Sequence, residues 1–238
     1  MFSKEIKFHS SFAGAVKEPT PALKHIPEYY KKLKSHINQS NKSVTVKKCI
    51  PFLDALTSGY IIPFPVDIQF VYDFEEEKVK WELSTVISGT AVANDLWPSA
   101  HDNIQMPEEM RFPNRTVEAV FKFSNVWKIK TPPGYSCIFT QPFNRVSSFK
   151  IIDGIVDTDT FDTQINFPFY WTGAIDKPTV LKEGTPMVQV IPFKREKWKM
   201  NIERENFDRV EEDLNMIKRQ SKIFDNYKTK FWNKKEYR

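Results

Sequence analysis

Short apolar segments separated by prolines dominate most of the chain. In Val66–Tyr72 polar and apolar positions alternate with a period of two, which is typical of a strand with one buried face. Similar β-branched and aromatic runs recur, and we predict strands at Val66–Tyr72, Thr116–Phe123, Tyr135–Thr140, Phe149–Val156, Phe161–Phe167 and Met187–Phe193. The 16 prolines outnumber the 7 glycines and lie beside these runs, as expected at strand starts, edges and turns. Short strands without intervening helices indicate an antiparallel sandwich or barrel.

Two stretches follow a helical period instead. Near residues 20–37, apolar residues recur every three or four positions, and we predict a short N-terminal helix that Pro27 kinks or restarts. Towards the C-terminus they form an imperfect heptad series, made of Phe207, Val210, Leu214, Ile217, Phe224 and Phe231. We predict a long amphipathic helix there, of about 25 residues, packed on the sheet or on a neighbouring subunit. Residues 233–238 are expected to fray.

Composition places the chain among folded proteins. Hydrophobic residues make up 40% and aromatic residues 14% of its 238 residues, whereas disordered chains contain few aromatics. No apolar run is long enough to span a bilayer, and the opening residues lack the apolar core of a signal peptide, so we expect a cytoplasmic protein with no membrane partner. The two cysteines, Cys49 and Cys137, are predicted to be reduced and buried.

The net charge of +5 lies in the C-terminal part of the chain. From residue 194 to residue 238 there are 14 Lys and Arg against 9 Asp and Glu, while the preceding part is balanced. A mixed-sign tail is typical of a solvated helix, since nucleic-acid footprints gather basic residues on one face. The charge pattern therefore argues against nucleic acid as a partner, and we predict two regions: a β-rich core domain over 1–200, and the helix with its basic tail over 201–238.

Common catalytic and metal-binding motifs are absent from the sequence. The four histidines form no metal-ligand pair with a second histidine or an acid on one element, so we expect no metal site of the protein's own. There is no nucleophile elbow around a serine, and neither glycine-rich phosphate loop occurs. Whether the protein is an enzyme stays open at this point.

One acidic stretch could carry chemistry. Asp157 and Asp159 are two residues apart, so their carboxylates point the same way if the chain is extended there, and Phe161 continues the alternation. Neighbouring carboxylates repel, so one of them tends to hold a proton, bind a cation or stay solvated. The alternative is a polar hairpin turn that the two carboxylates cap themselves.

This part of the chain resembles the core of the dUTPase and dCTP-deaminase superfamily, which has a β-clip fold. The similar stretches are a Pro-x-Gly before a strand at 132–134, a Gly-Ile-Val-Asp-x-Asp hairpin at 154–159, and a glycine and glutamine at 184 and 189. The resemblance implies that Asp157 activates water, that Phe161 stacks under a deoxyribose and that Gln189 lies near the base. The predicted nucleotide-like site comprises Asp157 and Asp159 as catalytic residues and Arg145, Gly154, Phe161 and Gln189 as ligand-binding residues.

The chain also departs from that superfamily. Its early acidic Ala-Gly-Tyr-Asp-Leu element is not visible, its serine-bearing Pro-Arg-Ser element would fall at 141–145, where no serine stands, and its glycine-rich C-terminal lid is replaced by a charged helix. A broader resemblance, carried by residues 24–34, 46–70, 127–145 and 184–198, is to an uncharacterised family of marine bacteriophages and some bacteria. It implies a phage-type origin and the cytoplasm of an infected host cell, or a virion, as the setting.

Together these observations predict a mainly β protein with a single jelly-roll or β-clip-like antiparallel barrel or sandwich, flanked by a short N-terminal and a long C-terminal helix. The β-clip resemblance implies a homotrimer. We expect a non-enzymatic binding module that contacts a host or virion protein. The alternative is a nucleotide-binding or nucleotide-hydrolysing enzyme of dUTPase-like fold, and Mg²⁺ is expected as a cofactor only in that case.

Overall fold

The computed structural model describes residues 4–37, 44–83, 98–100, 105–107, 120–204, 207–221 and 226–238. It is mainly β, with antiparallel sheets, and the described strands form no closed barrel. The longer strands are β3 (Tyr60–Pro63), β4 (Ile68–Asp73), β5 (Lys78–Leu83), β7 (Val120–Phe123), β9 (Tyr135–Thr140), β12 (Phe167–Trp171) and β14 (Pro186–Lys194). The shorter ones are β1 (Lys7–His9), β2 (Thr20–Pro21), β6 (Ser99–Ala100), β8 (Lys128–Lys130), β10 (Phe149–Ile151), β11 (Gly154–Val156) and β13 (Thr179–Leu181).

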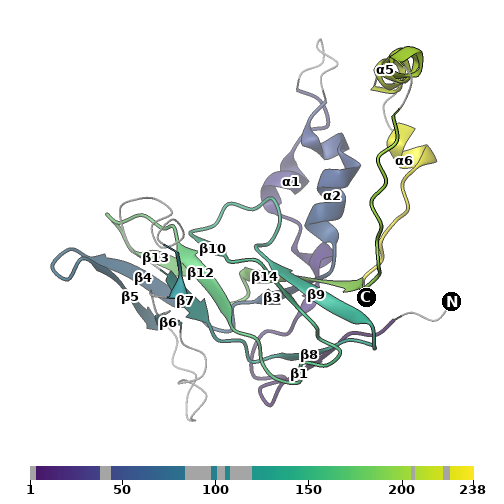
Figure 1. Cartoon of the computed structure of the whole chain (residues 1–238). Helices are drawn as coiled ribbons and strands as arrows, with labels where there is room; N and C mark the ends of the chain where they lie inside the picture. The colour runs from purple at the N-terminus through teal and green to yellow at the C-terminus, as the bar shows by residue number, and fades with distance from the viewer. Residues whose placement is uncertain are drawn as a thin grey trace.

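These strands form four antiparallel sheets (Figure 1). The largest has the order β11-β9-β14-β3-β2, and its central strand β14 pairs with β9 from Gln189↔Thr140 to Lys194↔Tyr135. The second sheet has the order β10-β12-β7-β6, the third is β13-β4-β5, and β1 pairs with β8. The mainly β, antiparallel prediction is therefore confirmed.

Phenylalanines join the sheets into one core. Phe139 of β9 stacks on Phe167 of β12 with ring centroids 5.6 Å apart, which links the five-stranded sheet to the four-stranded sheet. Phe70 of β4 meets Phe169 of β12 edge-on at 6.0 Å, which links the third sheet to the second. All four rings are buried, and each stabilises the fold by roughly 1.5–3 kcal/mol relative to an exposed ring.

Two of the predicted strands differ from the structure. The segment predicted at Phe149–Val156 is two strands, because the chain leaves the four-stranded sheet after β10 and joins the five-stranded sheet as β11. The strand predicted at Phe161–Phe167 is wrong: the carbonyl oxygen of Asp157 accepts hydrogen bonds from the amides of Thr160 and Phe161, so the chain turns there. Residues 116–119 of another predicted strand lie outside the described residues.

The helices are shorter than the periodicity predicts. Near residues 20–37 there are η1 (Ala22–His25) and α1 (Glu28–Lys32), separated at Pro27. The sequence prediction missed η2 (Val46–Lys48) and α2 (Ile50–Thr57). At the C-terminus the structure describes α5 (Phe207–Ser221) and α6 (Asn226–Lys230), with 222–225 outside the described residues, so one continuous helix of the predicted length is not shown.

The tryptophans and cysteines divide between core and surface. Trp127 and Trp171 are buried, but Trp198 is 87% exposed. Cys137 is buried and Cys49 is exposed, so the prediction of two buried thiols is wrong for Cys49, which lies just before α2.

Candidate functional site

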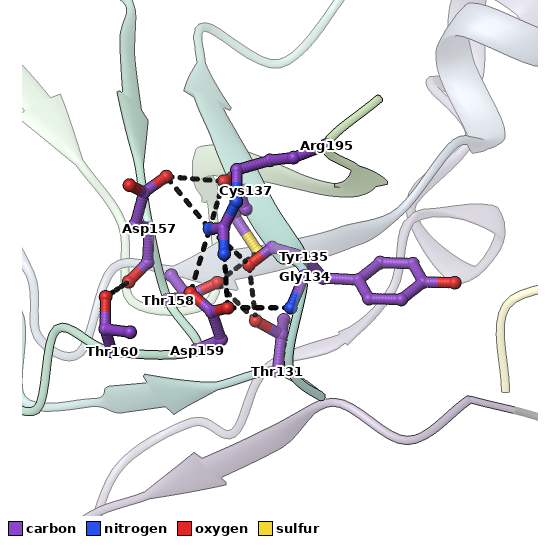
Figure 2. A network of polar contacts seen from close by, with 10 residues as sticks. Thr131, Gly134, Tyr135, Cys137, Asp157, Thr158, Asp159, Thr160 and Arg195 are labelled. Carbon is purple, nitrogen blue, oxygen red and sulfur yellow. Dashed lines mark hydrogen bonds and ion pairs between the residues drawn. The ribbon is translucent and has the colours of Figure 1, made fainter. Parts of the chain in front are cut away.

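Asp157 and Asp159 lie in a turn beside the start of β9. The hairpin pairs Val156 of β11 with Cys137 of β9, and the chain turns directly after Val156. The turn carries both carboxylates towards one guanidinium, that of Arg195 (Figure 2). Arg195 is the first residue after β14, the strand next to β9.

Arg195 clamps the two acids together. Its Nη1 donates to Oδ1 of Asp159 at 2.8 Å and lies 3.1 Å from Oδ1 of Asp157, and its Nη2 donates to the second oxygen of Asp159. Asp159 also accepts from the Gly134 amide at 2.8 Å, and Asp157 accepts from the Ser136 hydroxyl at 2.6 Å. The cation that two adjacent carboxylates call for is therefore supplied by the chain itself.

The clamp keeps Asp159 in its charged form. The hydrogen bonds from Arg195 and the Gly134 amide lower the pKa of Asp159 to about 2. The same contact with Asp159 raises the pKa of Arg195. A carboxylate with so low a pKa is a weak base at neutral pH, because catalytic efficiency is best when the pKa lies near the working pH.

A buried layer of hydroxyl and thiol groups lies under the clamp. The hydroxyl groups of Thr131 and Thr158 are 2.7 Å apart, and Thr158 donates to the sulfur of Cys137 at 3.3 Å. Burial raises the pKa of the Cys137 thiol to about 11, so it is protonated at neutral pH and is a poor nucleophile. These groups hold the turn against β9 and are not arranged for covalent catalysis.

The clamp fixes the point where the chain leaves the sheet. The Arg195 amide donates to the Gly134 carbonyl at 2.9 Å, which is the last backbone hydrogen bond before the chain runs out as an extended segment. We call residues 196–230 the arm. In Figure 1 the arm rises away from the sheets, carries α5 at its far end, and returns through α6.

The returning end of the arm is fastened to α2. Trp232 Nε1 donates to the two carboxylate oxygens of Asp54 at 3.1 and 3.0 Å, and Lys235 Nζ lies 2.6 Å from one of them. Tyr237 meets the Tyr60 ring edge-on, with centroids 5.8 Å apart. The prediction that residues 233–238 fray is therefore wrong, because this segment docks on the body through an ion pair and an aromatic contact.

The arm exposes large apolar side chains. Trp198, Met200 and Ile202 are 87%, 82% and 78% exposed. Because they alternate along an extended segment, they lie on one face of it. Val210, Leu214 and Met216 of α5 are also exposed. Single exposed apolar residues are normal, whereas a row of them is typical of a protein contact.

Gln189 lies at the other end of β9 from the two acids. It pairs with Thr140 at the end of β9, whereas Asp157 bonds Ser136 near its start. Gln189 is buried, its Nε2 donates to the carbonyls of Ser58 (2.6 Å) and Ala55 (3.0 Å), and its Oε1 accepts from the Phe143 amide (2.9 Å). The structure therefore does not bring this glutamine to the acidic turn.

Arg145 lies near Gln189, beside a surface hollow of about 550 Å³. It is half-buried: its Nη2 donates to the His25 carbonyl, and its Nε is buried with no hydrogen-bond partner in the described part of the chain. Burial lowers the pKa of Arg145. Tyr29, Phe143 and Asp153 also line the hollow.

Of the remaining predicted residues, Phe161 lies in the acidic turn and Gly154 directly follows Asp153, which lines the hollow. Phe161 is 44% exposed in the acidic turn, and its amide donates to the Asp157 carbonyl. Gly154 is exposed on β11, opposite Phe139, with open space where a side chain would stand. The acids with Phe161 and the pair Arg145 and Gln189 thus form two separate groups.

Sequence reasoning missed the residues that hold the arm. Arg195 is one of many basic residues in a charge-rich stretch, and its partners follow in no recognisable spacing. Asp54 and Trp232 are 178 residues apart in the chain. The only available signal was the alternation of Trp198, Met200 and Ile202, which directly continues β14.

Comparison with known proteins does not narrow the function. No protein-family model and no curated protein sequence matches the chain. Among the described residues, no group of three or more His, Cys, Asp or Glu side chains is placed to hold a metal ion. Within the same residues, none of the helices has both the length and the apolar character needed to cross a membrane.

Proposed function

We propose that the protein is a non-enzymatic binding or assembly protein whose C-terminal arm makes the contact. The observation that carries this proposal is the row formed by Trp198, Met200 and Ile202, all at least 78% exposed on one face of an extended segment. The body already has a continuous phenylalanine-rich core, so its folding does not account for three large apolar side chains left in water. Covering them stabilises a complex by roughly 25 cal/mol per Å² of apolar surface.

The two attachments of the arm support this proposal. The arm leaves the body at the Arg195 clamp and returns at the Asp54 contact. An arm attached to the body at both of its ends loses less conformational entropy on binding than a loose tail. The clamp acids then position the arm, and no reaction is assigned to them.

The phage-type resemblance extends this proposal to a partner in a virion or an infected host cell. A jelly-roll or β-clip-like arrangement of the sheets, and the homotrimer that goes with it, stay predictions. So do the predicted roles of Asp157, Asp159, Gly154, Phe161 and Gln189 in a nucleotide-like site.

The test compares the wild type with the triple variant Trp198→Ser, Met200→Ser, Ile202→Ser. Sedimentation velocity is run over a range of protein concentrations, alone and with host-cell or virion components. We expect the wild type to form a larger species that the variant does not form, with equal melting temperatures, since the three side chains contribute little to the folded body. Phe74→Ser with Ile155→Ser, which removes exposed apolar groups from the body, is the matched control. Identical association of the wild type and the triple variant would contradict the proposal.

Anion binding beside Arg145 is the second candidate, as the nucleotide hypothesis requires. Its support is the half-buried guanidinium, which has no carboxylate partner in the described part of the chain, next to a hollow of about 550 Å³. A buried cation gains from an anionic ligand, and the aromatic side chains of Tyr29 and Phe143 are suited to a base.

A thermal-shift series with nucleoside triphosphates, with and without Mg²⁺, tests this candidate. A ligand present at about 100 times its dissociation constant stabilises the folded state by about 2.7 kcal/mol. We expect a rise in melting temperature for the wild type and for Lys150→Gln, which removes an exposed charge on β10, and none for Arg145→Gln. A nucleotide response that survives Arg145→Gln would contradict the assignment.

A further inference from the structure

The first part of the arm resembles a β-strand without a partner strand among the described residues. Residues 196–204 are exposed, belong to no helix or strand, and run as an extended trace in Figure 1, and they make no backbone–backbone hydrogen bond within the described residues. They directly continue β14, the central strand of the largest sheet. An extended segment with a row of unpaired amides and carbonyls is a template for strand addition.

The charges of this segment are complementary to the same segment running the other way. If two copies lie antiparallel with Met200 opposite Met200, Glu196 of each copy faces Arg204 of the other, and Lys197 of each faces Glu203. A two-fold axis repeats both pairs, so the ribbon has four opposite-charge pairs and no like-charge pair. Opposite charges directly across a strand pair contribute roughly 0.2–1 kcal/mol each, whereas like charges destabilise it.

The same register matches the apolar residues. Trp198 of one copy lies opposite Ile202 of the other, with Met200 and its symmetry mate between them, so one face of the ribbon is a continuous apolar row. Aromatic and β-branched residues opposite each other are among the favourable cross-strand pairs. A shift of one residue would place the row of one copy against the polar face of the other.

Within a single chain the charges are only loosely compensated. Glu196 contacts Lys194, two residues earlier, at 2.6 Å on the exposed surface, and such contacts are worth little. Lys197 and Arg204 form no ion pair with any other described residue. Both are therefore available to a second chain.

We infer that the partner of the arm is a second copy of this chain, joined through an antiparallel two-stranded ribbon of residues 196–204 centred on Met200. This rests on the proposed function and names its partner. The ribbon is isologous, so it links copies in pairs. The side chains that meet are Trp198 with Ile202, Lys197 with Glu203 and Glu196 with Arg204.

Disulfide trapping tests the register. In a Cys49→Ser background, Met200→Cys places two thiols directly opposite each other, at a separation that a disulfide spans. Oxidation should then convert the protein to a covalent dimer. Lys199→Cys is the matched control, because in this register residue 199 faces residue 201 and its own symmetry mate lies further away. This variant should stay monomeric on gels run without reducing agent.

Charge exchange tests the pairing without a cross-link. Glu203→Lys should shift the sedimentation profile towards monomer, and adding Lys197→Glu should restore the dimer. Glu203→Lys with Lys199→Glu carries the same charges in the wrong register and should not restore it. Restoration by the second double variant alone would overturn the register centred on Met200.

The outcomes separate this inference from the proposed function. If Met200→Cys gives no dimer and the wild type is monomeric at high concentration, pairing with a second copy is wrong. If the triple variant at 198, 200 and 202 nevertheless loses an association with a host or virion component, the arm is a contact element with a different partner. If neither association depends on these side chains, both proposals fail.

Discussion

At the scale of single residues, the acidic turn shows how one basic residue, Arg195, bears on the interpretation of a sequence motif. Two aspartates spaced by one residue are compatible with catalysis, with cation binding or with a capped turn. The structure adds Arg195, whose guanidinium contacts both carboxylates and whose amide donates to the Gly134 carbonyl. Arg195 lies directly after β14, 36 positions further along the chain from Asp159.

The clamp predicts a defined loss of stability in acid. The pKa of Asp159 is about 2 in the folded protein, and an unfolded aspartate titrates near pH 4, so protonation favours the unfolded state. The stabilisation is therefore fully present above about pH 4 and is lost as the pH falls towards about 2. We expect Asp159→Asn to melt a few degrees below the wild type at pH 7 and to match it near pH 2. Parallel melting curves over this range, followed by circular dichroism, would contradict the role of the clamp.

Gln189 makes a prediction that separates a structural role from a ligand-binding one. Its side-chain amide donates to the carbonyls of Ala55 and Ser58 and accepts from the Phe143 amide, so Gln189→Leu leaves these partly buried groups without that partner. Each such group costs about 1–3 kcal/mol. We expect a clear fall in the free energy of unfolding, measured by urea denaturation, with no selective effect on nucleotide response. An unchanged denaturation midpoint together with a lost nucleotide response would favour the ligand-binding role.

At the scale of elements, local periodicity predicted the strands that stay within one sheet and misplaced those that cross between sheets. Tyr135–Thr140 has the predicted bounds because β9 pairs with β14 along its whole length, and with β11 at Cys137–Phe139. Phe149–Val156 reads as one strand, yet the chain changes sheets inside it. β10 buries Phe149 and Ile151, whereas Gly154 and Ile155 of β11 are exposed, and no local periodicity marks the change of sheet. The helix predicted near residues 20–37 was too long because Pro27 separates η1 from α1, and α2, with Pro51 in its first turn, was missed.

In the turn between α2 and β3, we expect one added methyl group, at Gly59, to have a large effect on stability. Gly59 has a φ of 69°, and a Cβ there would lie 2.0 Å from the Val190 carbonyl oxygen of β14. Gly184 has a similar φ of 81°, with nothing within 4 Å of the same position. We expect Gly184→Ala to cost roughly 1–2 kcal/mol, the price of the left-handed conformation alone. Gly59→Ala should cost considerably more and reduce the yield of folded protein. Equal unfolding free energies for the two variants would show that the backbone of β14 can shift here at little cost in free energy.

At the scale of the whole molecule, the sequence indicated a β body with a charged C-terminal region but not how the two are joined. The heptad-like series predicted a helix, and a helix is present as α5. The periodicity held no information on the extended segment before it or on the return of the chain to α2. That return depends on Asp54 meeting Trp232 and Lys235, which is a contact between residues far apart in sequence. Long-range polar contacts of this kind are invisible to any local pattern.

The second attachment of the arm can be broken without touching the core. Asp54→Ala removes the acceptor of Trp232 Nε1 and the ion-pair partner of Lys235. The Asp54 side chain lies on the surface of α2, and its contacts with the chain end leave it 16% exposed. We expect residues 231–238 to detach, so that trypsin cleaves after Lys234 and Lys235 much faster than in the wild type, with the melting temperature of the body almost unchanged. Glu236→Gln is the matched control, because within the described residues Glu236 forms ion pairs only with its neighbours Lys234 and Arg238. A detached tail would also leave the arm tethered at Arg195 alone, so association through the arm should weaken in Asp54→Ala and persist in Glu236→Gln. Unchanged cleavage in Asp54→Ala would mean that the aromatic contact of Tyr237 with Tyr60 is sufficient to hold the chain end in place.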